Sequence, residues 1–323
     1  MRVFVTGGSG YIGSVACRLL RQSGHSVAVY DDFVLGHREA LADDVTVFQA
    51  DLRDSAALKE AIADYGPDAV MHFGALALVG ESMAEPERYF SVNVVGGQNL
   101  LNAMVANGVK RLIFSSTCAT YGIPDSLPIT EATPQHPVNP YGESKRMFER
   151  MIYWYAQRHG LITTIFRYFN AAGAWDELGE HHEPETHLIP NVLKVAMGQT
   201  ECVEVFGADY ETPDGTCLRD YVHVRDLATA HLLALERAVE GCFNLSTGEP
   251  VSVKEVIDTA ERVTKVKIPR VFRPRRHGDP PILYAQAALA ATQLGWSPVH
   301  SDLGNILESA WKWHSEHPNG YAG

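Results

Sequence analysis

The sequence has few cysteines, and no two of them form a Cys-x-x-Cys pair. Their odd number suits neither a disulfide framework nor a thiolate zinc site; they are Cys17, Cys118, Cys202, Cys217 and Cys242. No apolar run approaches the roughly twenty residues of a membrane span. The expected first strand starts at the N-terminus, which leaves no room for a signal peptide. We therefore expect a cytoplasmic protein with no membrane partner.

Positive charge is also scarce, with 27 Lys and Arg against 39 Asp and Glu and a net charge of −12. This balance argues against binding to nucleic acids or to anionic membranes. It does not exclude a small anionic ligand, because a few local arginines and backbone N–H groups can hold one. The 323 residues are enough for one dinucleotide-binding domain and a smaller partner domain.

A glycine-rich turn follows directly on a short apolar strand at the start of the chain. Gly7, Gly10 and Gly13 have the spacing of a dinucleotide-binding loop, with roles in the tight turn, the approach of a pyrophosphate and the packing of the helix. The N-terminus of that helix suits a diphosphate. A second apolar run ends at Asp31, 18 residues after Gly13, where an acidic residue accepts hydrogen bonds from the adenosine ribose. Because a carboxylate repels a 2′-phosphate, Asp31, or its neighbour Asp32, favours NAD over NADP.

Apolar, β-branched runs then alternate with helical patterns, which predicts an α/β fold: a Rossmann-type, doubly wound parallel sheet with helices on both faces. The expected strands are 45–48, 69–73, 111–115, 162–169 and 242–245. Two long helices are expected over Glu87–Ala106 and Tyr141–His159, each preceded by a proline that suits a first turn.

The pattern changes after Asn170 to polar loops interrupted by glycine and proline, and Leu188–Met197 then resumes a helical pattern. Residues 224–245 return to the sheet, so the second domain is expected to be discontinuous. We assign 1–170 plus about 221–248 to the dinucleotide-binding domain, and about 171–220 plus 249–323 to a smaller substrate domain. The latter includes a capping box at Ser252 and Glu255.

A phenol and an ammonium lie one helical turn apart at Tyr141 and Lys145. Lowering a phenol pKa from about 10 towards neutrality needs about 4 kcal/mol, which we expect Lys145 and a nicotinamide ring to supply together. Thr117, 24 residues before Tyr141, ends an expected central strand at the edge where such sheets bind ligands. The three side chains predict a proton relay, although each alone also suits an ordinary helix or strand end.

With these residues the chain resembles the extended short-chain dehydrogenase/reductase superfamily and, within it, the UDP-glucose 4-epimerase (UDP-galactose 4-epimerase) family. The resemblance runs nearly end to end, through MRVFVTGGSGYIGS, HFGALALVGES, SSTCATYG, NPYGESK, RYFNAAGA, PETHLIP, DGTCLRDYVHVRDLA and PRRHGD.

The resemblance implies NAD-dependent inversion at C4 of a UDP-hexose, with Tyr141 as base and acid beside Thr117 and with Lys145 on the nicotinamide ribose. It implies cofactor contacts from the glycine loop and from Tyr11, Ile12, Asp31, Asp32, Asp51, Leu52, Phe73, Asn93, Ser115, Lys145 and Tyr168. It implies substrate contacts from Asn170, His187, Leu188, Phe206, Arg219, Arg276, Asp279 and Leu283, with Arg219 and Arg276 facing the diphosphate.

Two positions depart from the family pattern. Ala77 replaces a lysine that reaches the cofactor phosphates in some members, and Leu283 replaces a tyrosine that excludes N-acetylated sugars in others. UDP-N-acetylhexosamines, UDP-pentoses and UDP-uronates therefore stay open as substrates. A 4,6-dehydratase is a weaker alternative, because Cys118 and Ala119 stand where that family has an Asp-Glu pair. A non-catalytic NAD sensor is another, but such proteins tend to lose one of the three catalytic groups.

Two further expectations concern metals and assembly. His181, His182, Glu183, Glu185 and His187 are close in sequence, but they lie in a loop without the H-x-x-x-H order of a helix, so no metal is expected. Met151 and Trp154 lie on the outer part of the expected Tyr141 helix, which favours a homodimer.

Overall fold

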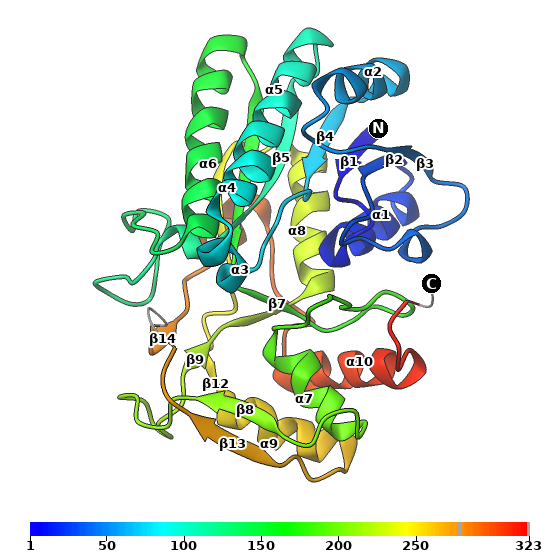
Figure 1. Cartoon of the computed structure of the whole chain (residues 1–323). Helices are drawn as coiled ribbons and strands as arrows, with labels where there is room; N and C mark the ends of the chain where they lie inside the picture. The colour runs from blue at the N-terminus through cyan, green and yellow to red at the C-terminus, as the bar shows by residue number, and fades with distance from the viewer. Residues whose placement is uncertain (277–279, 322–323) are drawn as a thin grey trace.

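The computed structural model describes residues 1–276 and 280–321. Its largest sheet has seven strands, all paired in parallel (Figure 1). In spatial order they are β11 (Gly241–Leu245), β6 (Ile162–Tyr168), β5 (Arg111–Thr117), β4 (Ala69–His72), β1 (Arg2–Thr6), β2 (Ser26–Asp31) and β3 (Thr46–Gln49). The order reverses between β1 and β4, as in a doubly wound fold, so the predicted fold class is confirmed.

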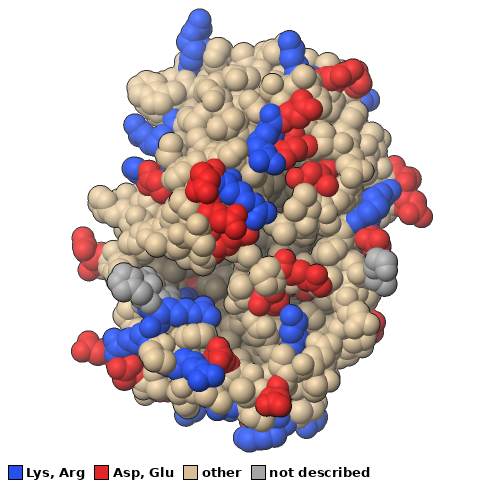
Figure 2. Space-filling view, in the orientation of Figure 1, with Lys and Arg blue, Asp and Glu red and all other residues tan. Residues whose placement is uncertain are grey.

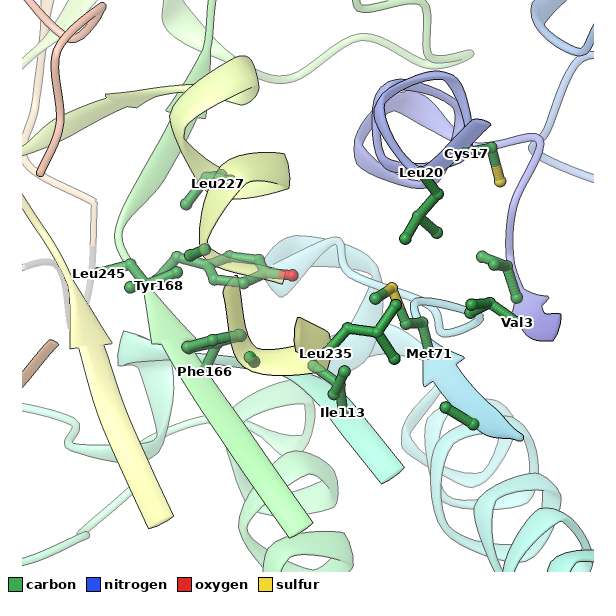
Figure 3. Close-up of a cluster of buried hydrophobic side chains, with 14 of the residues drawn as sticks. Val3, Cys17, Leu20, Met71, Ile113, Phe166, Tyr168, Leu227, Leu235 and Leu245 are labelled. Carbon is green, nitrogen blue, oxygen red and sulfur yellow. The ribbon is translucent and has the colours of Figure 1, made fainter. Parts of the chain in front are cut away.

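Helices cover both faces of this sheet because successive strand residues point to opposite sides. Val3 and Val5 of β1 join one buried cluster with helices α1 (Tyr11–Gln22) and α8 (Val224–Arg237). Figure 3 shows Val3 together with Leu20 of α1 and Leu235 of α8. Phe4, between Val3 and Val5, joins a second cluster with helices on the other face. Those helices are α2 (Ser55–Tyr65), α5 (Gly97–Ala106) and α6 (Pro140–His159).

The helix expected over Glu87–Ala106 is confirmed, with a change to π-helical hydrogen bonding in its middle. It consists of α4 (Pro86–Tyr89), a π-helical turn η2 (Phe90–Gly96) and α5. Two glycines at the end of this turn allow close packing: a Cβ on Gly96 would lie 3.0 Å from Leu52, and one on Gly97 2.5 Å from Phe148. The wider turn directs Asn93 inward, where its side chain is buried.

The remaining elements form a smaller group below the large sheet (Figure 1). It contains three small sheets: β7 (Asn170–Ala172) with β10 (Tyr221–His223), β8 (Val203–Phe206) with β13 (Arg270–Arg273), and β9 (Leu218–Arg219) between β12 (Val251–Ser252) and β14 (Ile282–Leu283). Helices α7 (Leu188–Ala196), α9 (Val253–Thr264) and α10 (Leu303–Glu316) share their own hydrophobic cluster with these strands.

The capping box expected at Ser252 begins helix α9. The Ser252 hydroxyl accepts a hydrogen bond from the Glu255 N–H at 2.9 Å and caps α9. The last elements are short: α3 (Val79–Ala84) and the single turns η1 (Arg38–Ala40), η3 (Cys118–Thr120) and η4 (Ala290–Leu294). Within 1–276 and 280–321, no helix combines the length and the apolar character that crossing a membrane requires.

Candidate active site at the carboxyl edge of the sheet

The turn between β1 and α1 has the shape that its glycines predict. Gly7 has a φ of +69°, and a Cβ there would lie 2.4 Å from the backbone nitrogen of Gly74. A Cβ on Gly13 would lie 2.1 Å from the carbonyl oxygen of Gly7. Helix α1 can therefore pack this closely on the turn after β1 only because residue 13 has no side chain. A Cβ on Gly10 would find no atom of the described chain nearer than 3.4 Å. Gly10 also begins α1 without a side-chain cap, so the N–H groups of the first turn suit a diphosphate.

Three acidic residues lie at the ends of neighbouring strands. The Asp31 carboxylate accepts hydrogen bonds from the N–H groups of Ser9 and Phe33, both at 3.0 Å, which places it against the glycine turn. Asp32 is exposed and accepts from the Val34 N–H at 3.1 Å. Asp51 instead pairs with Arg53, whose hydrogen bonds hold the pKa of that carboxyl below its usual range.

Apolar groups border the same region. Leu52 is buried, and the ring of Phe73, directly after β4, contacts that of His231 in a tilted arrangement with centroids 4.6 Å apart. The Tyr11 hydroxyl, in the first turn of α1, donates to the carbonyl oxygen of Gly173 at 2.5 Å. This bond joins the glycine turn to the segment after β7, and Ile12 packs beside it against the sheet.

Tyr141, Thr117 and Lys145 come together where β5 ends and α6 begins. Asn139 caps the helix by accepting from the Gly142 N–H at 2.8 Å, and Pro140 follows in the first turn. Tyr141 is thereby brought beside Thr117, whose hydroxyl acts to lower the pKa of the phenol. One turn later, the Lys145 ammonium donates to the carbonyl oxygen of Ser115 at 2.8 Å and lies 4.8 Å from the Phe114 ring centroid.

Burial has the largest effect on the pKa values of both Tyr141 and Lys145. It raises the pKa of Tyr141 to about 12, while the hydroxyl of Thr117 acts in the opposite direction. Burial lowers the pKa of Lys145 to about 7, against the effect of Glu149 one turn further on. The lowering of the phenol pKa that we expect from Lys145 and a nicotinamide ring together stays a prediction, and in the chain alone burial outweighs the hydroxyl of Thr117.

The inner wall of the site is formed by hydrogen-bonded polar side chains. The Asn93 amide accepts from the Leu76 N–H at 2.9 Å and donates to the Leu76 carbonyl and to the Ser144 hydroxyl, both at 3.0 Å. The Ser115 hydroxyl hydrogen-bonds the Tyr168 phenol at the end of β6. All of these groups lie beside the Thr117, Tyr141 and Lys145 set.

The residues expected to contact the substrate lie across from that edge. The register of β9 and β14 places Leu283 opposite Arg219, and Asn170 starts β7 by donating to the carbonyl oxygen of Asp220 at 2.9 Å. The Arg276 guanidinium lies 3.9 Å from the Phe206 ring centroid. The surface between the two halves is hollowed, with Lys and Arg side chains on its lower edge (Figure 2).

Two further expected substrate residues lie at the start of α7. His187 is its N-cap residue, without a side-chain cap hydrogen bond, and Leu188 is its first residue. The Nδ1 atom of His187 bonds two carboxylates, Glu180 and Glu185. Asp279 lies outside the described residues.

Two residues of the site are absent from the sequence-based prediction. The Tyr89 ring meets Tyr141 edge-on at 6.4 Å, and no pattern within its helix distinguishes it from a core residue. Asp220 is fully buried and accepts from the hydroxyl and N–H of Thr247, both at 2.8 Å, which holds the strand end beside Asn170. In the sequence, Asp220 could have been found from its position directly after Arg219 in the RDYVH motif.

Two glycine substitutions separate ligand approach from packing. Gly10→Ala is expected to leave the thermal midpoint within a few degrees but to reduce bound dinucleotide, because its Cβ meets only the space in front of the helix. Gly13→Ala is expected to cost about 1–3 kcal/mol of stability, because its Cβ overlaps the Gly7 carbonyl. Denaturant unfolding and dinucleotide content by absorbance test both. Equal stability of the two variants would contradict these roles.

Comparison with known proteins agrees with this geometry. Residues 3–245 match the model of the NAD dependent epimerase/dehydratase family. The chain is 48% identical to the UDP-glucose 4-epimerase of Halalkalibacterium halodurans, over 100% of this chain and 98% of that protein. The UDP-glucose 4-epimerase of Brucella ovis, solved with NAD, superimposes with a TM-score of 0.93 at 46% identity, covering 96% and 97% of the two chains. The enzyme of Bifidobacterium longum, solved with NAD+ and UDP, gives 0.95 at 36% identity over 99% and 100%. The chain therefore belongs to the NAD-dependent epimerase/dehydratase family.

Proposed function

We propose that this protein is an NAD-dependent enzyme that inverts C4 of a UDP-hexose and so interconverts UDP-glucose and UDP-galactose. The observation that carries the proposal is the contact between Tyr141 and Thr117, with Lys145 one turn away, at the edge of the sheet where the glycine turn suits a dinucleotide. The likeness to UDP-glucose 4-epimerases covers the whole chain and supports the same reaction.

In this reaction Tyr141 would act as a phenolate, stabilised against its burial by Lys145 together with the positive nicotinamide ring; it takes the proton of the sugar 4-hydroxyl and later returns it, with Thr117 beside it. NAD supplies, when bound, a transient acceptor for the hydride of C4 and its donor on return. Lys145 orients the nicotinamide ribose from its buried position. Return of hydrogen to the opposite face of a 4-keto sugar inverts the centre, and no NAD is consumed.

Inversion requires a firm grip on the nucleotide and a loose grip on the hexose. Arg219 and Arg276 supply guanidinium groups for the diphosphate, and Phe206 lies under Arg276. Asn170, His187, Leu188 and Leu283 complete the proposed pocket, and Asp279 is assigned to it from sequence alone. We propose that residues 171–220 and 249–323 form this substrate domain and that the remainder, 1–170 and 221–248, binds NAD.

A 4,6-dehydratase needs an acid and a base next to the sugar C5 and C6. Here the residue after Thr117 is Cys118, which packs with Tyr121, Ile129 and Phe169. Burial raises the pKa of its thiol to about 12, so it is neither an acid nor a base at neutral pH. This environment favours epimerisation over elimination of water.

Tyr141→Phe tests the proposal. We expect kcat with UDP-galactose to fall by about 10²- to 10⁴-fold while the UDP dissociation constant stays within about twofold, because the proton carrier acts only in the transition state. Tyr155→Phe, further along α6 and bonded to Asn102 at 2.7 Å, is the matched control and should keep full activity. Parallel loss of UDP affinity and rate in Tyr141→Phe would contradict the role.

The sugar specificity is proposed to depend on Leu283. Leucine leaves more room than tyrosine beside the hexose 2-substituent, so we expect turnover of UDP-GlcNAc as well as UDP-glucose. Leu283→Tyr should lower kcat/KM for UDP-GlcNAc by about 10-fold or more and leave UDP-galactose turnover nearly unchanged. The control is Ile282→Tyr, on the opposite face of β14. If the unmodified enzyme does not interconvert UDP-GlcNAc at a saturating concentration, the proposed acceptance of N-acetylated sugars is wrong.

We also propose a homodimer that pairs through α6. Trp154 and Tyr153 are 61% and 48% exposed on this helix, and Met147 lies two turns before Trp154. Val95 of η2 and Met83 of α3, on elements that pack on α6, extend the apolar surface. Beside it, α5 and α6 run together at the outer side of the sheet (Figure 1). A second copy of the chain would bury this surface by packing helices against helices.

Trp154→Glu is expected to convert the dimer into a monomer, because a carboxylate in an apolar interface loses its hydration. Light scattering after size-exclusion chromatography measures the mass. Val299→Glu, at an apolar side chain that is 70% exposed elsewhere, controls for added charge and should remain dimeric. A monomeric unmodified protein would refute the dimer.

We propose a cytoplasmic location from the cysteines. No disulfide joins any two of the five, all of which lie within the described residues, and Cys17, Cys118 and Cys217 are buried, which suits a reducing compartment.

A further inference from the structure

The segment between β7 and α7 gathers two carboxylates and two imidazoles at one point. Glu180, His182, Glu185 and His187 each offer one ligand atom, and these four atoms lie within 4.8 Å of one another. The sequence-based cluster included His181 and Glu183 and omitted Glu180. In the structure, His181 and Glu183 face each other at 3.7 Å, and Glu183 has a side chain that is 87% exposed.

The two histidines meet the carboxylates differently. The Nδ1 atom of His187 lies 2.9 Å from Glu180 and 2.8 Å from Glu185, at hydrogen-bond distance. The Nδ1 atom of His182 lies 3.5 Å from Glu180 and 3.6 Å from Glu185. It is buried and makes no hydrogen bond to any part of the chain that the structure describes. This imidazole nitrogen is thus at ion-pair distance from both carboxylates, and farther from them than the nitrogen of His187 is.

These separations fit ligands around a metal ion. Zinc binds imidazole nitrogen and carboxylate oxygen at about 2.0–2.2 Å, so neighbouring ligand atoms of a tetrahedral site lie about 3.4 Å apart. The two distances from His182 are close to this value, and those from His187 require an opening of about half an ångström. Imidazole with carboxylate is a ligand set that favours zinc over magnesium or calcium.

The charges fit as well. The side chains of Glu180 and Glu185 are 6% and 3% exposed, and two buried carboxylates need two positive charges. Without an ion, burial is outweighed by the two carboxylates, which raise the pKa of His182 and His187, so two imidazolium groups supply these charges; one divalent ion would supply both and displace the two protons. The side chain of His187 is 42% exposed, so an ion can reach the site from solvent past this residue.

We propose that Glu180, His182, Glu185 and His187 bind one zinc-class divalent ion. Four protein ligands leave no open position, so the ion is structural. It holds the start of α7, where His187 is the N-cap residue, and it lies beside Tyr11 of α1, whose ring meets His182 edge-on at 6.3 Å. The site thereby fastens the loop after β7 to the helix that follows the glycine turn. This proposal does not depend on the proposed reaction.

Zinc and cobalt binding to the full-length protein test the site. The NAD-containing protein is stripped with a chelator, titrated with Zn²⁺ against a chromophoric competitor, and analysed for metal by mass spectrometry. We expect one Zn²⁺ per chain, a higher thermal midpoint with Zn²⁺, and the intense visible absorption of four-coordinate Co²⁺ when that ion is used. Less than one ion per chain, or the weak spectrum of six-coordinate Co²⁺, would overturn the proposal.

Neighbouring glutamates provide a matched pair of variants. Glu185→Gln removes a ligand and should weaken Zn²⁺ binding by about 100-fold or more, whereas Glu183→Gln, two residues away and exposed, should bind as the unmodified protein does. His182→Gln should repeat the effect of Glu185→Gln through a different ligand. Equal Zn²⁺ affinity in Glu185→Gln and Glu183→Gln would place the ion elsewhere and refute the site. Should Glu185→Gln fail to fold, the Co²⁺ spectrum of the unmodified protein decides.

Discussion

One buried hydrogen bond joins the helix that carries the reactive phenol to the strand that carries its partner. The Lys145 ammonium donates to the Ser115 carbonyl at 2.8 Å, and a buried ammonium requires such an acceptor. Because β5 continues to Thr117, two residues beyond Ser115, Tyr141 is held at the Thr117 hydroxyl one turn before Lys145. The position of the phenol therefore depends on where α6 is fixed along β5.

The close approach of α6 depends on small residues. A Cβ on Gly142 would lie 2.4 Å from the Ala119 carbonyl oxygen, so the helix meets η3 at backbone distance. Gly97 permits the same closeness between α5 and Phe148 of α6. Burial created in this way favours the neutral forms of both Tyr141 and Lys145. Glu149 opposes this at Lys145 and is itself held by the buried guanidinium of Arg167.

Much of this arrangement could be predicted from the sequence because it depends on short spacings. The strands followed from β-branched runs, and Tyr141 with Lys145 followed from helical periodicity. The π-helical segment after Tyr89 could not be predicted, and neither could the hydrogen bonds of its buried residue Asn93 with Leu76 and Ser144. The amides and hydroxyls of those hydrogen bonds come from three separate elements and leave no local pattern.

The sequence by itself determined the order of strands and helices, the glycine turn, the preference for NAD and the phenol–ammonium pair. Each of these depends on residues within a few positions of one another, where backbone geometry is sufficient. Only the tertiary structure decided that Leu283 lies opposite Arg219, and that Glu180, rather than Glu183, joins His182 and His187. Those choices depend on strand register and on which side chains the loop after β7 buries, and both are set by packing between segments distant in the chain.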